Sequence, residues 1–311
     1  MSWIFFFKLT LIITTQSSSL LAHAYDNLIR HPGATTETSG ASKVTTICET
    51  FDEKSFLEMF PKVRAVSFIH SCSLEGQNSQ ILIDILGILR SSGLIDRLDM
   101  IWVLNYGVDI ADSVKVQFPK VAWVQCSRDV SGFEVPTIRA LHKWSQLASE
   151  QDSNAHVLYL HTKGVSYREV YQQIEDWRRM MMYFLVEEHV ACYHLLQSGL
   201  FDAIGSNYVT SPTRYFSGNF WWATTSYLSS LPDLSITSGK YDAEHWVLSA
   251  KSSRIYVMHS SAVNHAIEVY PGHKYIKGKN SALAHTSLKQ RQNFNHDNRE
   301  NVTKCSALHI R

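Results

Sequence analysis

The sequence predicts an α/β fold with a largely parallel sheet. Short apolar runs rich in β-branched and aromatic residues recur along the chain, and segments with helical spacing alternate with them. Polar residues follow several of these runs directly, as in HVLYLHTKGVSY at 156–167. In open α/β sheets, ligands bind beyond the carboxyl ends of the strands. These polar residues therefore mark an expected binding edge.

Each element has its own signal. Strands are expected at residues 63–70, 100–107, 121–126, from 156 onward, and late in the block at 254–261. Helices are expected at residues 79–91, from Pro136 to about 147, and at 174–199. The first stops at Gly93 and the last at Gly199, and Pro136 suits a first helical turn.

The charge balance excludes a global attraction to polyanions. Lys plus Arg is 29 and Asp plus Glu is 28, so the formal net charge is +1. No nucleic-acid partner is expected, because no global basic field would attract one. Any anion binding must come from a local arrangement of side chains.

The chain divides into four expected parts. Residues 1–24 contain an apolar run at 3–14 and end in Ala22-His23-Ala24, typical of a secretory signal peptide, with an uncleaved membrane anchor as the alternative. Residues 25–58 are predicted to be a stalk, 59–275 the folded domain and 276–311 an irregular extension. The expected location is the secretory pathway, either the Golgi or ER lumen or outside the cell. The glycosylation sequon at Asn301 is compatible with it.

The five cysteines have no metal-binding spacing. One or two disulfides are expected, with Cys48–Cys305 as one pairing, and buried free thiols throughout are the alternative. The cysteines alone do not decide between these.

The strand that begins at residue 156 runs straight into a polar turn. His161, Thr162 and Lys163 follow the apolar run, and Gly164 allows a close backbone approach. An isolated charge in apolar surroundings is costly. The turn is therefore either prepared for an anion or the solvated start of a loop.

Several motifs together resemble a known family. YLHTKG, DWRRMMMYFL, GSNYV, YFSGNFWWA and YDAEHW, spread over about residues 63–261, are similar to glycosyltransferase-like proteins of the GT-A type from eukaryotes and viruses. Bacterial rhamnan-synthesis-type proteins share the HTK and WR features. The resemblance implies a Rossmann-like sheet that binds a nucleotide-diphosphate sugar and transfers the sugar to the hydroxyl of a glycan or glycoconjugate acceptor.

The resemblance also implies site roles. The diphosphate contacts would come from the strand-end turn and the start of the long helix: His161, Thr162, Lys163, Gly164 and Arg178. The sugar and acceptor contacts would come from the aromatic segment and two flanking positions: Ser217, Gly218, Asn219, Trp221, Trp222, Glu134 and Trp246. The structural alternatives are an aromatic core strand for the tryptophans and a helix cap for Glu134.

Glu244 is the expected catalytic base if the reaction inverts the sugar, and Asp242 is the alternate. The structural alternative gives both acids to a helix start, where carboxylates cap and oppose the dipole. A non-catalytic secreted carbohydrate-binding protein on the same scaffold is the alternative function.

The chain contains no Asp-x-Asp, the motif that holds a divalent metal in most GT-A enzymes. Either Lys163 neutralises the diphosphate directly, or His161 helps to hold a Mn or Mg ion, with His259 as a further possible ligand. The sequence therefore leaves open whether a metal cofactor is bound.

Overall fold

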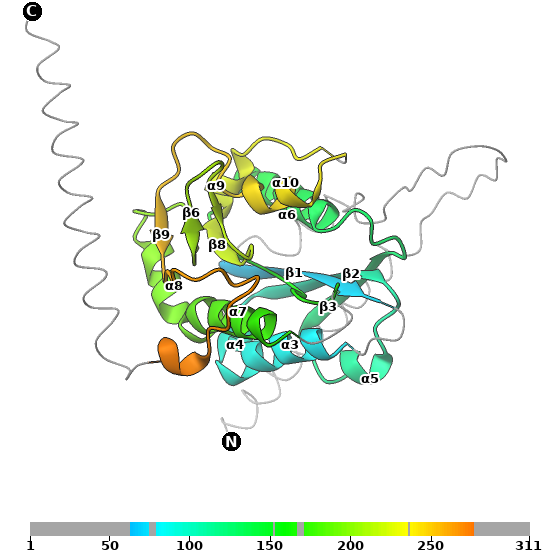
Figure 1. Cartoon of the computed structure of the whole chain (residues 1–311). Coiled ribbons are helices and arrows are strands. Elements are labelled where there is room, and N and C mark those ends of the chain that lie inside the picture. The colour runs from blue at the N-terminus through cyan, green and yellow to red at the C-terminus, as the bar shows by residue number, and fades with distance from the viewer. Residues whose placement is uncertain (1–62, 75–78, 152, 167–170, 236, 277–311) are drawn as a thin grey trace, which may run out of the picture.

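The computed structural model describes residues 63–74, 79–151, 153–166, 171–235 and 237–276 (Figure 1). The expected signal or anchor, the stalk up to residue 58, the extension beyond 276, the Cys48–Cys305 pairing and Asn301 lie outside the described residues. Among the helices that are described, none has the length and apolar character needed to cross a membrane.

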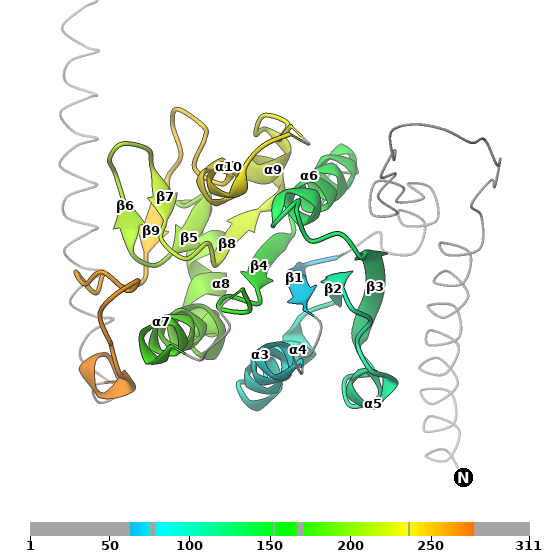
Figure 2. The same cartoon turned by 45° about the vertical axis from the view of Figure 1, so that its right-hand side comes forward.

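A seven-stranded, mostly parallel sheet forms the centre of the described part of the chain. Its order is β3-β2-β1-β4-β8-β5-β9, and β8 runs antiparallel to both of its neighbours while the other pairs are parallel. The strands are β1 Ala65–Ser73, β2 Met100–Gly107, β3 Val121–Ser127, β4 His156–His161, β5 Ala203–Gly205, β8 Trp221–Thr224 and β9 Ile255–Val257. A small antiparallel pair lies beside it, formed by β6 Tyr208–Val209 and β7 Tyr215–Phe216 (Figure 2).

Helices cover both faces of this sheet, as Figure 1 shows. One face carries α6 Val135–Glu150, α9 Thr225–Ser229 and α10 Lys240–Trp246. The other face carries α3 Gln80–Ser91, α4 Leu94–Arg97, α5 Asp112–Lys115, α7 Gln172–Met182, the π-helical turn η2 Tyr183–Glu187 and α8 His189–Gln197. A 3₁₀ turn, η3 Gly272–Lys274, packs against α7. The predicted α/β class with a mostly parallel, helix-flanked sheet is confirmed.

Most predicted elements are present, with two differences. The helix expected at 174–199 is interrupted by the π-helical turn η2, so it continues as two α-helices rather than one. The late strand expected at 254–261 is limited to Ile255–Val257. The carbonyl of Leu185 in η2 accepts a hydrogen bond from Trp222 Nε1 at 2.7 Å, so the π-helical turn supplies an acceptor to the core.

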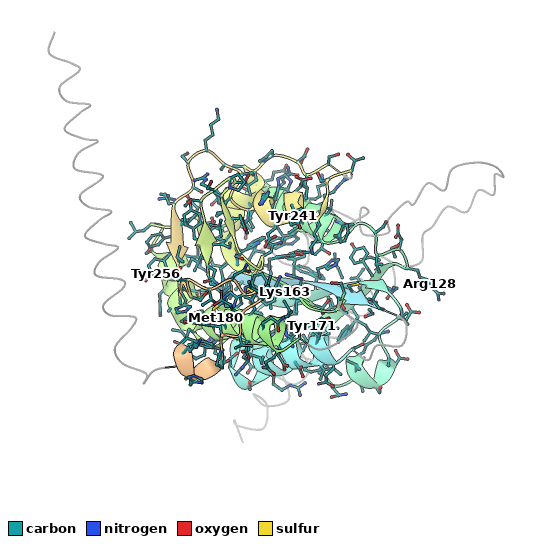
Figure 3. All side chains as sticks on the ribbon, in the orientation of Figure 1. Arg128, Lys163, Tyr171, Met180, Tyr241 and Tyr256 are labelled. Carbon is teal, nitrogen blue, oxygen red and sulfur yellow. The ribbon has the colours of Figure 1, made fainter. Side chains whose placement is uncertain are left out.

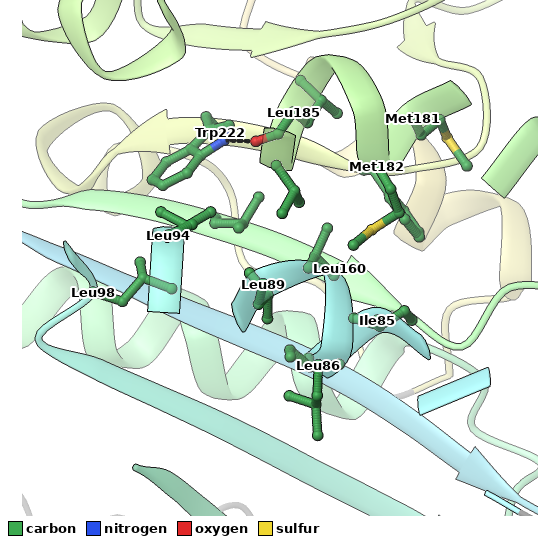
Figure 4. Packing of buried hydrophobic residues seen from close by; sticks show 14 of the residues in the cluster. Ile85, Leu86, Leu89, Leu94, Leu98, Leu160, Met181, Met182, Leu185 and Trp222 are labelled. Atoms are coloured by element: carbon green, nitrogen blue, oxygen red, sulfur yellow. Dashed lines mark hydrogen bonds between the residues drawn. The ribbon is translucent and has the colours of Figure 1, made fainter. Parts of the chain in front are cut away.

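The aromatic strand β8 supplies one tryptophan to each side of the sheet. Successive residues of a strand point to opposite faces. Trp222 packs with Leu94, Leu160 and Leu185 (Figure 4), whereas Trp221 packs on the face covered by α6 and α10. Because helices cover both faces, both side chains have 0% exposure.

The described cysteines are in two states. Cys126 is disulfide-bonded, whereas Cys72 and Cys192 are free thiols. The alternative in which all the cysteines are free thiols is therefore wrong.

Candidate functional site

The polar turn after β4 is fastened to the end of β1. The Thr162 amide donates to the His70 carbonyl at 3.0 Å, and the Thr162 hydroxyl accepts from the Cys72 amide at 3.0 Å. Gly164 has a φ of +101°, and a Cβ there would lie 3.1 Å from Ile174 Cγ2. The turn is thus held at the carboxyl edge of the sheet, and the Thr162 side chain already serves as a structural acceptor.

His161 connects this turn to the SGN turn, which lies 57 positions later. The buried imidazole donates from Nε2 to the Gly218 carbonyl at 2.9 Å. Since a carbonyl only accepts, the proton sits on Nε2. Burial, with the nearby Lys163 charge, lowers the pKa of His161 to about 3. His161 therefore serves as a neutral strut between two of the predicted motifs.

Gly218 holds the site's carboxylate. It has a φ of +97°, and a Cβ there would lie 2.5 Å from Met181 Sδ, so a side chain would be strained. Its amide donates to Glu244 Oε1 at 2.9 Å. The half-buried acid of α10 is thereby bound to the same turn that His161 contacts. No described residue donates a hydrogen bond to the second oxygen, Oε2. That oxygen remains available as an acceptor.

A buried polar network lies behind this turn. Glu134 Oε2 accepts from the Tyr159 hydroxyl at 2.8 Å and from Asn219 Nδ2 at 2.7 Å. Asn219 Oδ1 accepts from Trp221 Nε1 at 2.9 Å. Burial, followed by the Glu134 carboxylate, raises the pKa of Tyr159 well above its usual range. The network joins β4, β8 and α6 into one rigid support.

The network corrects two predicted roles. Asn219 is 1% exposed, and its amide is occupied by protein groups, so the prediction that it binds sugar hydroxyls is wrong. Glu134 sits at the N-cap position of α6 without capping it, because its side chain turns to Tyr159 and Asn219 instead. The predicted cap role is wrong. The role of Glu134 as a sugar contact stays a prediction, since the network occupies Oε2 while Oε1 lies 3.7 Å from His161 Nδ1.

Lys163 presents the cation of the site. Its Nζ lies 3.8 Å from the centroid of the Trp177 ring, in a cation–π contact. Burial lowers the pKa of Lys163, and the Glu244 and Glu134 charges partly oppose this. His265 stacks on the same indole, with centroids 5.3 Å apart and planes 11° apart. Among the described residues, no carboxylate comes within ion-pair distance of this ammonium group.

The tryptophans predicted to stack on a sugar are wrong as ligand contacts. Trp221 and Trp222 are fully buried, and Trp246 is 3% exposed with its Nε1 donating to the Pro232 carbonyl at 2.8 Å. A ring without an exposed face cannot stack on a ligand. For Trp221 and Trp222 the physical reason is the helical cover on both faces of β8, whereas Trp246 points from α10 into the core.

Three further predicted residues have structural contacts. Arg178 Nη1 donates to the Lys163 carbonyl at 2.9 Å, so Arg178 connects α7 to the turn after β4. Asp242 Oδ2 accepts from the Gly239 amide at 2.8 Å, which is the helix-start role that the sequence allowed. Ser217 donates its backbone amide to the Asn207 carbonyl at 3.0 Å.

The histidines suggested for a metal are engaged elsewhere. His161 Nε2 is bonded to the Gly218 carbonyl, and His259 Nε2 pairs with the Tyr270 hydroxyl at 3.0 Å. Within the described ranges, no group of three or more His, Cys, Asp or Glu residues is arranged to hold a metal ion. These contacts give no support to the assignment of His161 and His259 as Mn or Mg ligands.

Sequence reasoning missed Tyr159 and left Trp177 as packing. The alternation of strand residues carries a signal for Tyr159, because positions 159 and 161 share one face of β4. Trp177 gave no such signal, since a helical tryptophan is usually a core residue. Its contact with Lys163 depends on where α7 lies against the turn.

We expect acid to destabilise the fold before the carboxylates titrate. Burial lowers the pKa values of His70 and His156 to about 4 and that of His161 to about 3. Below pH 6.5 these histidines are protonated in the unfolded chain but stay neutral in the folded protein. The free energy of unfolding therefore decreases as the pH is lowered, by about 1.4 kcal/mol per pH unit for each histidine. Urea unfolding at pH 7 and pH 5 measures this, and equal free energies of unfolding would contradict it.

Comparisons with known proteins give the following. A family model described as "Domain of unknown function (DUF8361)" matches residues 105–236. No curated protein matches the chain. Among solved structures, a 4-diphosphocytidyl-2C-methyl-D-erythritol synthase is similar with 13% sequence identity and a TM-score of 0.37, over 68% of this chain and 96% of that one. The strand order given above, rather than this likeness, defines the fold.

Proposed function

We propose that this protein transfers a sugar from a nucleotide-diphosphate sugar to an acceptor hydroxyl, and that it does so in the secretory pathway. The observation that carries the proposal is that a cation and a carboxylate lie on two neighbouring turns that His161 joins. Lys163 lies at the end of β4, and Glu244 is bonded to Gly218, which His161 ties to that same strand end. The motif resemblance to GT-A-type proteins supports the same reaction.

Lys163 would receive the donor's diphosphate. Its ammonium packs on an indole and is partly withdrawn from water, which strengthens its attraction for an anion. No carboxylate of the described residues pairs with it, so an incoming diphosphate displaces no ion pair. As the nucleoside diphosphate leaves, this charge offsets the negative charge that develops on it.

Glu244 would act as the base of an inverting reaction. Oε1 is held by the Gly218 amide, which leaves Oε2 to take the proton of the acceptor hydroxyl. The acceptor oxygen forms a bond to the anomeric carbon while the bond from that carbon to the diphosphate oxygen breaks. The proton ends on Glu244 and the electron pair on the leaving nucleoside diphosphate.

Replacement of Lys163 tests the proposal. We expect Lys163→Ala to weaken binding of UDP, GDP or CDP by about 10- to 100-fold, because a hydrogen bond to a charged group contributes about 1.5–3 kcal/mol. Calorimetric titration of each nucleotide into the purified protein measures the dissociation constants. The matched control is Lys115→Ala on α5, whose lysine pairs with Asp112. Undiminished binding by Lys163→Ala would remove the basis of the assignment.

The alternative of a non-catalytic carbohydrate-binding protein, which the missing Asp-x-Asp motif motivates, would need sugar contacts other than those predicted. Asn219 and Trp222, the side chains that would have gripped a free sugar, are buried and occupied by protein partners. The nucleotide titration separates the two functions. Binding of free sugar without any binding of nucleotide would favour the alternative.

A further inference from the structure

The first turn of α10 exposes an aromatic ring that the core does not use. Tyr241, which is labelled in Figure 3, is 68% exposed. The next two apolar positions of the helix, Ala243 and Trp246, are buried. The apolar face of so exposed a ring is removed from water only when a ligand or partner binds over it. Tyr241 is therefore a candidate contact for a ligand.

A second tyrosine lies beside the same helix. Tyr215 of β7 is half-buried, and its ring centroid lies 5.1 Å from that of His245 on α10. Burial raises the pKa of Tyr215, and the nearby Glu244 and Tyr241 raise it further. The two tyrosines and the carboxylate thus lie within electrostatic reach of one another.

The spacing on α10 places the ring on the side of the carboxylate. Tyr241 and Glu244 are three positions apart, and residues at this spacing are neighbours on a helix surface. Glu244 Oε1 is bonded to Gly218, so the unbonded Oε2 has its position fixed. A molecule lying over Tyr241 would bring its polar edge to this oxygen.

We propose that Tyr241, with Tyr215 beside it, is the platform on which the acceptor saccharide stacks, so that one of its hydroxyls reaches Glu244. This inference rests on the proposed function. The C–H face of a pyranose is apolar and suits an aromatic ring, while its hydroxyls suit a carboxylate oxygen. The platform takes over the role that the sequence gave to Trp221 and Trp222, whose rings are enclosed.

The acceptor fits this platform better than the donor nucleotide does. The cation that would hold the diphosphate is Lys163, on the turn after β4, whereas Tyr241 belongs to α10 and adjoins the carboxylate that takes the acceptor's proton. In a direct displacement, the acceptor oxygen attacks the anomeric carbon of the donor on the side opposite the departing diphosphate. The side of the base is the acceptor side.

Saccharide binding without nucleotide tests the platform. The full chain is mixed with lactose, cellobiose, N,N′-diacetylchitobiose or mannobiose, and dissociation constants are measured by saturation-transfer NMR. We expect at least one disaccharide to bind. We expect Tyr241→Ala to weaken it about fivefold or more and Tyr241→Phe, which keeps the ring, to bind it as the unmodified protein does. Val116→Ala, at a 74% exposed position after α5, is the control for loss of an exposed apolar side chain.

Calorimetric titration of UDP, GDP and CDP into the same variants separates this inference from the proposed function. Unchanged nucleotide binding by Tyr241→Ala is expected. The platform is overturned if no disaccharide binds the unmodified protein, or if Tyr241→Ala binds the disaccharide equally well. It is also overturned if Tyr241→Ala loses nucleotide binding instead, which would mark Tyr241 as a nucleobase contact. If Tyr241-dependent saccharide binding occurs while no nucleotide binds, the platform stands and the transferase proposal fails.

Discussion

Glu244→Gln is expected to slow sugar transfer by about 10²- to 10⁴-fold while leaving nucleotide binding unchanged, because general base catalysis contributes about that factor. Glutamine keeps an oxygen that can accept the Gly218 amide, so the turn and His161 should stay in place. What is lost is a carboxylate able to take a proton. Initial rates of nucleoside diphosphate release, with nucleotide dissociation constants from calorimetry, measure both quantities.

Asp242→Asn on the same helix is the matched control. An asparagine oxygen can still accept the Gly239 amide, so α10 should begin as before and the rate should stay near that of the unmodified protein. A full rate in Glu244→Gln would show that the base is not Glu244. Equal loss in both variants would point to a disturbed helix rather than to lost proton transfer.

Trp222→Ala is expected to lower the free energy of unfolding by about 3–5 kcal/mol. The side chain is fully buried between β8 and the helices beneath the sheet, so its removal leaves a cavity (Figure 4). It also takes the hydrogen-bond donor away from the Leu185 carbonyl. Urea denaturation of both proteins, with the slope of the transition compared, gives the difference.

Trp177→Ala provides the comparison for that measurement. Trp177 is only half-buried, so less apolar surface is lost and we expect a smaller loss of stability. A Trp222→Ala protein as stable as the unmodified one would show that the ring is not part of the core.

The first half of the fold could be predicted because its strands are long, buried runs. β2 matches the expected range, and β1, β3 and β4 differ from theirs by a few residues at their ends. The short strand β5 gave no such signal, and β8 was recognised only as the alternative of an aromatic core strand. Two adjacent tryptophans must point to opposite faces of a strand, but no local pattern says whether both faces are covered.

The position of the turn after β4 at the edge of the sheet was predictable, whereas the hydrogen-bond partners around it were not. Parallel strands deliver their carboxyl ends to one edge, so the turn after β4 was expected to meet ligand there. The choice of Glu134 as partner of Asn219, 85 positions away, depends on how α6 packs over β8. Asn219 therefore looked like a ligand contact although it is a structural link.

The contacts of α7 set a limit on how far the chain can be shortened. Asp176 Oδ2 accepts from the Tyr270 amide at 3.1 Å, and His265 lies flat against Trp177, the ring on which Lys163 rests. A truncated protein ending at β9 would still possess every strand of the main sheet. It would lack His265, however, so the Trp177 indole that contacts Lys163 would lose its stacking partner. Expression boundaries for functional work therefore belong beyond residue 276, even though the last strand ends at Val257.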